Sequence, residues 1–402
     1  MASSEHSAHV AGVRLSAVSA GIKTEGRLDL VLMELAEGSA VAATFTRNAF
    51  CAAPVTVARE HLDTASARYL LVNTGNANAG TGEQGIEDAR RCCRSLAGLA
   101  GVESEQVLPF STGVIGEHLP VERMEAVFGR AIESLDEGNW ASAAEGILTT
   151  DTRPKLASRQ VRSAGQAYSL AGIAKGSGMI RPNMATMLAY VCTDAAIDPG
   201  FLQQTWSTVV ENSFNRVSVD GDTSTNDAAI LVATGSAGNE AIASSSHPDY
   251  TAFLEALQSL ALELAQALVR DGEGASKFVE VSVQGGRNEE ECLQVAYTVA
   301  HSPLVKTALF ASDPNWGRLL MAIGRAGVED LDVGEIAVLI NGVLIAEAGC
   351  RAPAYTEEQG VAAMQPEDIL IEIRLGRGDA DASVWTSDLS YDYVRINAEY
   401  RT

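Results

Sequence analysis

The sequence is poor in positive charge. Its 402 residues carry 29 Lys and Arg against 52 Asp and Glu, which gives a formal net charge of −23. A surface this acidic repels phosphate backbones, which argues against nucleic-acid binding as the main task.

Cysteine pairs at metal-binding spacing are also missing. The six cysteines form no CxxC motif and have no histidine-rich neighbour, so they predict no metal site. In a reducing cytoplasm they are expected to be buried, small apolar residues. They are Cys51, Cys92, Cys93, Cys192, Cys292 and Cys350.

No stretch predicts a membrane span, and the first residues show neither a secretory nor a mitochondrial targeting pattern. We therefore expect a cytoplasmic protein without a membrane partner. The most apolar segment, residues 253–270, still contains Glu255 and Glu263. Its apolar residues follow helical spacing, which predicts an amphipathic helix with one buried face. They are Phe253, Leu257, Leu260, Leu264 and Leu268.

Several common catalytic and binding motifs are absent. There is no GxxxxGK[ST], HExxH or GxSxG pattern and no order that fits a histidine triad. "GTGEQG" (80–85) satisfies GxGxxG, but the preceding strand pattern ends too early to place a pyrophosphate at the helix start. "DGDTSTND" (220–227) lacks the glycine and the acid of a calcium loop and predicts a polar turn. Asn73, Asn76 and Asn78 lie in a tight loop and are expected to orient other loops.

Strand-like and helix-like patterns are mixed along the chain, which predicts an α/β or α+β protein with layered sheets. Glycine and charge cluster at 283–291, so we predict a core domain over 1–285 and a smaller domain over 286–402. Strand patterns occur at 29–35, 69–75, 186–195, 228–235, 278–286, 293–302, 336–349 and 369–376, and helix patterns at 86–101, 121–135, 201–214 and 253–270.

The stretch "KGSGMIRPNMATMLAYV" (175–191) changes at Thr186 from a Gly, Pro and Asn-rich turn to an apolar run. Thr186 could simply open a β-strand, and residue types alone favour this interpretation. Alternatively, a strained turn lets the Thr186 hydroxyl attack the carbonyl of Ala185, and water then releases a new N-terminal threonine. Its α-amine, with an ordinary pKa of about 7.7 to 8.0, could take the hydroxyl proton.

The segment "PFSTGVIGEHLP" (109–120) places Thr112 and Gly113 after a short strand pattern. A hydroxyl beside a glycine N–H can form an oxyanion hole, the pair of donors that an acyl-transfer intermediate requires. Taken alone, the same pattern also fits an ordinary turn between a strand and a helix.

Seven segments together resemble one family closely, the glutamate N-acetyltransferase / ornithine acetyltransferase family of arginine biosynthesis. They appear in family order from the first third of the chain to its last residue, which is far more specific than any single segment. They are "NTGNANAGTGEQG", "STGVIGE", "TTDTRPK", "AKGSGMIRPNMATMLAYVCTDA", "SFNRVSVDGDTSTND", "SDPNWGR" and "RINAEYRT".

The resemblance implies that the precursor cuts itself between Ala185 and Thr186. This would leave an α chain of residues 1–185 and a β chain of residues 186–402. Thr186 would then take acetyl from N²-acetylornithine, release ornithine, and pass acetyl to glutamate in a ping-pong cycle.

The resemblance also implies a fold, an assembly and a set of site residues. The fold is a two-domain α/β protein with a layered αββα core like that of N-terminal-nucleophile amidases, and the assembly is an α2β2 heterotetramer. No cofactor or metal is implied, and acetyl-CoA is expected as a second acetyl donor for glutamate, although no single residue decides this. The matched residues are Thr112 and Gly113 for the oxyanion hole, and Thr152, Lys175, Thr186, Glu273, Asn397 and Thr402 for substrate contacts.

Lys175 has a physical rationale of its own. Substrates with α-carboxylates need a local cation in so acidic a chain, so Lys175→Met is expected to raise KM for both amino acids.

Three alternatives remain. The protein could be a monofunctional ornithine acetyltransferase that does not use acetyl-CoA. It could be an N-terminal-nucleophile amidase or aminopeptidase, in which water takes the acyl group. It could also be a binding module in which "PNMAT" is only a turn, and the chain would then stay intact.

Overall fold

The computed structural model describes residues 8–163, 165–181 and 187–399. The chain forms two compact units: the first comprises residues 1–176, 181–215 and 222–268, and the second comprises 177–180, 216–221 and 269–402.

The units do not divide at the predicted boundary between residues 285 and 286. The glycine and charge cluster that suggested it ends strand β11 (Phe278–Gly286) and begins helix α7 (Glu289–Ala300), and both belong to the second unit.

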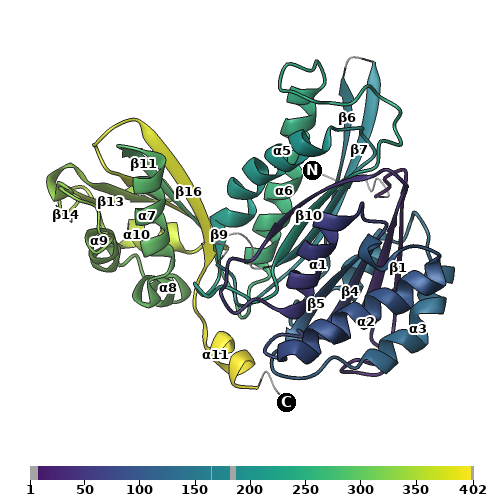
Figure 1. The fold of residues 1–402 in the computed structure, drawn as a ribbon. Helices are drawn as coiled ribbons and strands as arrows, with labels where there is room; N and C mark the ends of the chain where they lie inside the picture. Colours follow the sequence, from purple (N-terminus) through teal and green to yellow (C-terminus); the bar gives the residue numbers. More distant parts are fainter. Residues whose placement is uncertain (1–7, 164, 182–186, 400–402) are drawn as a thin grey trace. The chain divides into compact units, whose positions relative to one another are not determined.

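Two sheets form the first unit (Figure 1). The smaller sheet has the order β1-β2-β4-β5, antiparallel except for the parallel pair β4 and β5. The larger has the order β3-β10-β8-β7-β6, antiparallel except for the parallel pair β10 and β8. The strands are β1 Val13–Val18, β2 Leu30–Leu35, β3 Ala40–Phe45, β4 Tyr69–Asn76, β5 Val107–Val114, β6 Lys155–Ser163, β7 Gln166–Lys175, β8 Leu188–Thr193 and β10 Ala228–Ala233.

The two sheets pack face to face on a shared apolar core. Val31 and Met33 of β2 share one cluster with Tyr190 of β8 and Ile230 of β10. The ring of Phe110 on β5 meets that of Tyr190 edge-on, with centroids 5.3 Å apart. Because side chains alternate along a strand, the intervening residues of the smaller sheet face the other way, onto helices.

Helices cover both outer faces, which completes the predicted αββα layering (Figure 1). On the smaller sheet, α2 and α3 share a cluster with outward residues such as Leu32. On the larger sheet, the Trp206 indole of α5 donates to the Ala229 carbonyl at 2.9 Å, and Gly172 of β7 leaves room for Leu264 of α6. The helices of this unit are α1 Ala53–Thr64, α2 Gly82–Ala100, α3 Val121–Glu133, α4 Trp140–Gly146, α5 Pro199–Glu211 and α6 Tyr250–Arg270, with the 3₁₀ helices η1 Ser104–Gln106 and η2 Phe214–Arg216 near the ends of α2 and α5.

Helix α6 is long and apolar enough to pass a length and composition test for a membrane span. Its packing confirms the amphipathic prediction instead. Phe253, Leu257, Leu260, Leu264 and Leu268 are each no more than 1% exposed, as expected for the buried face of a core helix.

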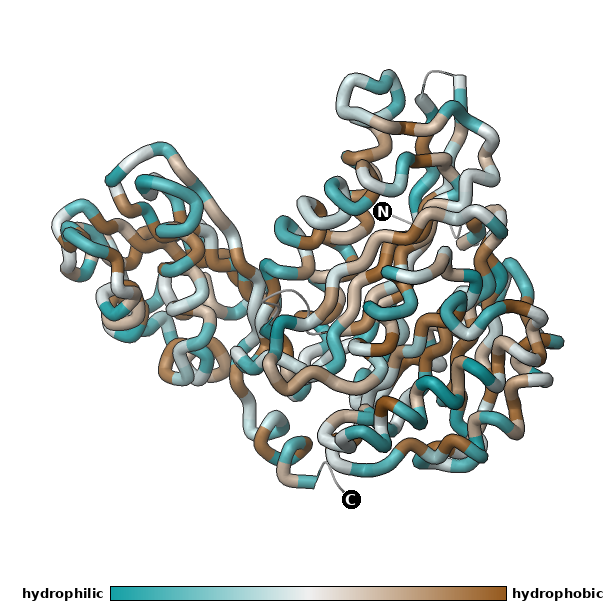
Figure 2. Tube along the Cα trace, in the orientation of Figure 1, coloured by the Kyte–Doolittle hydropathy of each residue, from teal (hydrophilic) through white to brown (hydrophobic). Residues whose placement is uncertain are grey.

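The second unit is built on a seven-stranded sheet of order β14-β13-β12-β15-β11-β16-β9. Figure 2 shows brown, hydrophobic residues running along the strands of each unit, with teal residues in many of the connections. The remaining strands are β9 Val217–Ser218, β12 Ala337–Ile340, β13 Val343–Glu347, β14 Cys350–Arg351, β15 Asp368–Arg374 and β16 Ala380–Ser387. The further helices are α8 Pro303–Phe310, α9 Trp316–Gly324, α10 Glu357–Met364, α11 Tyr391–Ala398 and the 3₁₀ helix η3 Val333–Glu335.

The strand predicted at 293–302 is wrong, because these residues lie mainly in helix α7. The Asn288 side chain caps the helix by accepting from the Glu291 N–H, and three acidic residues in the first turn favour the positive end of the helix dipole. Cys292, Val295, Ala296, Val299 and Ala300 are buried at helical spacing.

Two of the cysteines depart from the predicted burial. Cys92, Cys93, Cys192 and Cys292 are buried, but Cys51 is half-buried and Cys350 is exposed on the edge strand β14. An edge strand lacks a neighbour on one side, and β14 is only two residues long.

Candidate active site

The predicted cleavage point, Ala185 and Thr186, lies outside the described residues, as does Thr402. Strand β8 begins two residues after Thr186, at Leu188, in the interior of the larger sheet. Leu188 pairs with Lys175 on β7 and with Ala228 on β10. The strand predicted after Thr186 is therefore present, and its first residue lies beside Lys175.

Thr112 and Gly113 lie within the last residues of β5 rather than after it. Gly113 has a φ of 137°, and a Cβ there would come within 2.3 Å of the Gly75 carbonyl carbon on β4. Only glycine fits this close approach. The Thr112 hydroxyl therefore belongs to the residue before a glycine whose backbone conformation no other residue fits.

The prediction that Asn73, Asn76 and Asn78 lie in one tight loop is wrong in part, because β4 extends to Asn76 and includes Asn73. Asn76 and Asn78 do hold neighbouring segments, as predicted. The Asn76 amide donates to the carbonyls of Glu117 (3.2 Å) and His118 (3.0 Å), just beyond β5. The Asn78 amide donates to the Gly85 carbonyl at 2.8 Å inside α2. The "GTGEQG" run therefore lies at a helix start fixed by asparagine side chains.

Lys175 connects the two sheets of the first unit. Its ammonium donates to the Thr112 hydroxyl at 3.2 Å and to the Thr149 hydroxyl at 2.7 Å, and its side chain is 9% exposed. The structure therefore brings Lys175 and Thr112, two of the predicted residues, into direct contact.

Asp151 forms an ion pair with Lys175. The sequence analysis did not single out this aspartate. Its fully buried carboxylate lies 3.8 Å from the Lys175 ammonium and accepts from Lys155 and from the Gly176 N–H, each at 2.7 Å. Burial alone would raise the pKa of Asp151, but the two ammonium groups and the backbone donor hold that pKa well below its usual range. The "TTDTRPK" segment contains Asp151, but nothing in it shows which lysines the carboxylate meets.

Asp227 is a second acidic residue that the sequence analysis did not single out. It is 2% exposed and immediately precedes β10, and its Oδ2 has no hydrogen-bond partner in the described part of the chain. Burial raises the pKa of Asp227 well above its usual range, against the opposing effects of Ser224, Lys175 and the Met187 N–H. A buried carboxyl group with a raised pKa therefore lies at the end of the sheet where β8 begins.

The other predicted residues fall in two places. Thr152 is exposed and directly follows Asp151 in the first unit. In the second unit, the Asn397 amide on α11 donates to the Glu273 carboxylate at 2.8 Å, and Glu273 is 9% exposed. Glu273 and Asn397 are thus paired.

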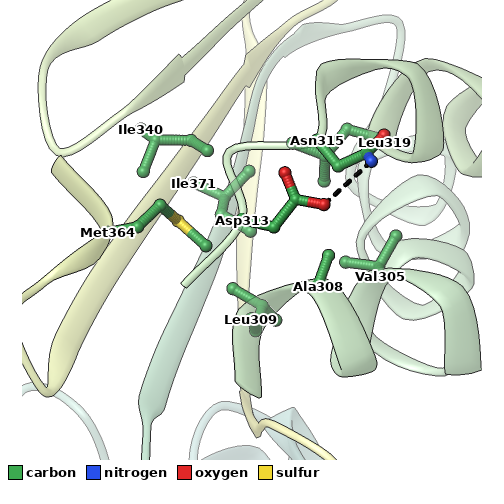
Figure 3. A pocket seen from close by; sticks show the side chains of 9 residues that line it. All are labelled: Val305, Ala308, Leu309, Asp313, Asn315, Leu319, Ile340, Met364 and Ile371. Atoms are coloured by element: carbon green, nitrogen blue, oxygen red, sulfur yellow. Dashed lines mark hydrogen bonds between the residues drawn. The ribbon is translucent and has the colours of Figure 1, made fainter. Parts of the chain in front are cut away.

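The second unit also contains a small pocket (Figure 3). Apolar side chains line most of it, and the Asn315 amide donates to the Asp313 carboxylate at 3.0 Å. Both residues belong to the "SDPNWGR" segment, in which Asn315 caps α9 by accepting from the Arg318 N–H. Among the described residues, no lysine or arginine lines this pocket, so it suits a carboxylate-bearing substrate poorly.

Comparison with known proteins identifies the family of the chain. The model of the ArgJ family matches residues 14–402. The chain belongs to the ArgJ family. It is 57% identical over 393 residues to the arginine biosynthesis bifunctional protein ArgJ of Pseudomonas syringae pv. tomato, covering 98% of this chain and 97% of that protein. It is 55% identical over 394 residues to the protein of the same name from Methylococcus capsulatus, covering 98% and 96%.

A solved structure supports the family fold. The crystal structure of the arginine biosynthesis bifunctional protein argJ from Bacillus halodurans is 42% identical to this chain, with a TM-score of 0.51. The match covers 53% of this ArgJ-family chain and 99% of the solved chain.

Proposed function

We propose that this ArgJ-family protein is an acetyltransferase of arginine biosynthesis that moves acetyl from N²-acetylornithine to glutamate. One observation carries the proposal: the family match runs over nearly the whole chain, to relatives named as bifunctional proteins of arginine biosynthesis. The contact of Lys175 with Thr112 supports it, since both residues match functional positions of the family.

The enzyme would first activate itself. The Thr186 hydroxyl adds to the carbonyl carbon of Ala185, the C–N bond breaks, and the Thr186 nitrogen becomes a free amine. One water then hydrolyses the ester and leaves a carboxylate on Ala185 and a hydroxyl on Thr186.

Acetyl transfer would follow in two half-reactions. The Thr186 oxygen attacks the acetyl carbon of N²-acetylornithine, and ornithine leaves as the amine after taking a proton. The α-amine of glutamate then attacks acetyl-Thr186 and restores the hydroxyl. In each half-reaction, Thr112 and the N–H of Gly113 would stabilise the negative charge that develops on the carbonyl oxygen.

Charged groups would position the substrates. The Lys175 ammonium is the cation that we assign to substrate carboxylates, and Thr152 directly follows its ion-pair partner Asp151 in sequence. The Glu273 carboxylate, which accepts from Asn397, suits an amino group of ornithine. Thr402 is the last of the residues that we propose to contact substrate.

The remaining features are also proposals. We expect an α2β2 assembly in the cytoplasm, with no bound cofactor and with acetyl-CoA as a second acetyl donor for glutamate. Glutamate supplied with acetyl-CoA alone gives N-acetylglutamate if the donor range includes acetyl-CoA. Absence of product would leave the monofunctional alternative.

A direct assay tests the main reaction. Purified protein incubated with N²-acetylornithine and glutamate should release ornithine and N-acetylglutamate in equal amounts. With glutamate omitted, a transferase consumes acetylornithine slowly, whereas an amidase consumes it readily. Ready consumption without glutamate would contradict the proposed function.

A further inference from the structure

The second unit contains a short backbone segment, residues 177–180, that precedes the cleavage point in sequence. Residues 177–180 belong to this unit, although the chain on either side of them belongs to the first. If the chain is cut before Thr186, these four residues are in the α chain. The residues that hold them are in the β chain.

We propose that Asp220 is a positioning residue for self-cleavage and afterwards keeps the end of the α chain docked on the β chain. This inference rests on the proposed function.

The Asp220 carboxylate accepts two consecutive backbone N–H groups. Met179 donates to Oδ2 at 2.7 Å and Ile180 donates to Oδ1 at 2.9 Å. The Tyr393 hydroxyl donates to the same Oδ2 at 3.3 Å. Both oxygens of one carboxylate therefore fix two adjacent peptide planes, and hydrogen bonds to a charged acceptor are stronger than neutral ones.

The carbonyl of Ile180 is held by the two residues before Asp220. It accepts from the Val219 N–H at 2.8 Å and from the Ser218 hydroxyl at 3.1 Å. The Ile180 side chain is fully buried. Ile180 is therefore fixed through its N–H, its carbonyl and its side chain, and the cleavage point follows five residues later.

The other end of the segment is fixed by Glu273. Its N–H donates to the Ser177 carbonyl at 2.8 Å. A Cβ at Gly178 would approach the Glu273 carboxylate to 2.6 Å, so a larger residue there would displace the end of the Glu273 side chain. The residue proposed to contact substrate thus also holds the segment.

The backbone conformation of Met179 needs this support. Its φ is 49°, in the left-handed region that non-glycine residues rarely adopt, at a cost on the order of 1 to 2 kcal/mol. The bonds to Asp220 offset that cost in the uncut chain. Without them, Met179 would relax to a commoner conformation, and the precursor would present the scissile bond less often.

The cleavage rate of freshly synthesised precursor tests the proposal, followed by denaturing gel or intact mass over time. We expect about tenfold or slower cleavage for Asp220→Ala, from the loss of two charge-assisted bonds. The cleavage rate of Asp220→Asn should lie between those of the unmutated protein and Asp220→Ala, because the Asn amide keeps one acceptor oxygen.

Asp388 offers a matched control in the same unit. Its carboxylate also accepts two consecutive backbone N–H groups, from Ser276 (2.8 Å) and Lys277 (3.0 Å), but every partner lies in the β chain. Asp388→Ala should lower stability without slowing cleavage. An Asp220→Ala precursor that cleaves at the unmutated rate, or an equal slowing in Asp388→Ala, would overturn the proposal.

Hydrogen exchange on the unmutated protein provides a second test that does not depend on the folding of a variant. The amides of Met179 and Ile180 should exchange slowly in the protein as purified, because both donate to Asp220. Rapid exchange of both in the unmutated protein would also overturn the role of Asp220. An unmutated precursor that stays intact would instead contradict the proposed function.

Discussion

The Lys175 ammonium lies 3.2 Å from the Thr112 hydroxyl oxygen and thereby joins strand β7 of one sheet to strand β5 of the other. Because the ammonium can only donate, the Thr112 oxygen is the acceptor in this bond. The hydroxyl hydrogen must then point away from Lys175. This arrangement prepares Thr112 to donate, as an oxyanion-hole residue must.

Removing the Thr112 hydroxyl tests its role as a donor. We expect Thr112→Val to lower kcat by about 10² to 10³, as for loss of one oxyanion donor. Thr64→Val is a suitable control, because Thr64 is exposed at the end of α1 and its hydroxyl bonds only within that helix. Normal cleavage and turnover in Thr112→Val would show that the pair is misassigned.

Removing the Lys175 charge tests substrate binding. Lys175→Met should raise KM for both acetylornithine and glutamate, since each carries an α-carboxylate. Because Lys175 contacts Thr112, the effects of Lys175→Met and Thr112→Val on kcat should be less than additive in the double variant. Steady-state kinetics of the three variants measure both effects, and unchanged KM in Lys175→Met would remove the assigned role.

The low pKa of Asp151 predicts a loss of stability in acid. The folded protein holds this carboxyl ionised below the unfolded-state pKa of about 3.9, so it binds fewer protons than the unfolded chain. Its stabilising contribution is complete above about pH 5 and is lost as the pH falls toward the folded-state pKa. Asp151→Asn should therefore be less stable by about 3 kcal/mol near neutrality and approach the unmutated protein in acid.

Denaturant unfolding of the two proteins at several pH values measures this difference. A difference in the free energy of unfolding that stays constant down to pH 3 would contradict the assigned ion pair.

The fully buried Lys306 of α8 predicts a pH dependence of the same sign as that of Asp151, but in the alkaline range. Burial lowers the pKa of Lys306 to about 8, partly offset by Asp388 and Asp220, and its ammonium donates to Thr386 at 3.0 Å and to the Ser387 carbonyl. Between pH 8 and about 10.4 the unfolded chain binds the proton that the folded chain has lost, so the Lys306 contribution to stability rises with pH.

Thermal unfolding of the unmutated protein and of Lys306→Met across this pH range measures the contribution of Lys306 to the free energy of unfolding. We expect the difference between them to change by roughly 3 kcal/mol from pH 8 to 10.4. A difference that does not vary with pH would show that Lys306 titrates normally.

Local pattern predicted strands such as β2, β4 and β15 and the helices α2, α3, α5 and α6, because their buried residues repeat along the chain. It indicated no strand at β1, β3, β6, β7 or β16 and no helix at α1, α4 or α8 to α11. It failed at 293–302, where β-branched and aromatic residues suggested a strand. The decisive signals lay just outside that run, in the cap Asn288 and the acidic first turn of α7. A helical spacing of Cys292, Val295 and Val299 was present but was not recognised.

The residues of the site could be predicted from the sequence only by matching them to positions of the family. Thr112, Lys175 and Thr152 could be matched to motifs, but the contact between Lys175 and Thr112 depends on how the two sheets pack. Asp151 and Asp227 were missed for the same reason. Their altered pKa values come from burial and from charges that are distant in sequence, which no short motif encodes.

Intact mass spectrometry of the denatured protein, before and after incubation with N²-acetylornithine, tests the central claim most directly. Two chains with the masses of residues 1–185 and 186–402 should appear, and the second should gain one acetyl group that glutamate removes. Thr186→Ala should remain a single chain without acetyl. A full-length, unacetylated mass for the unmutated protein would contradict the assignment of Thr186 as the nucleophile.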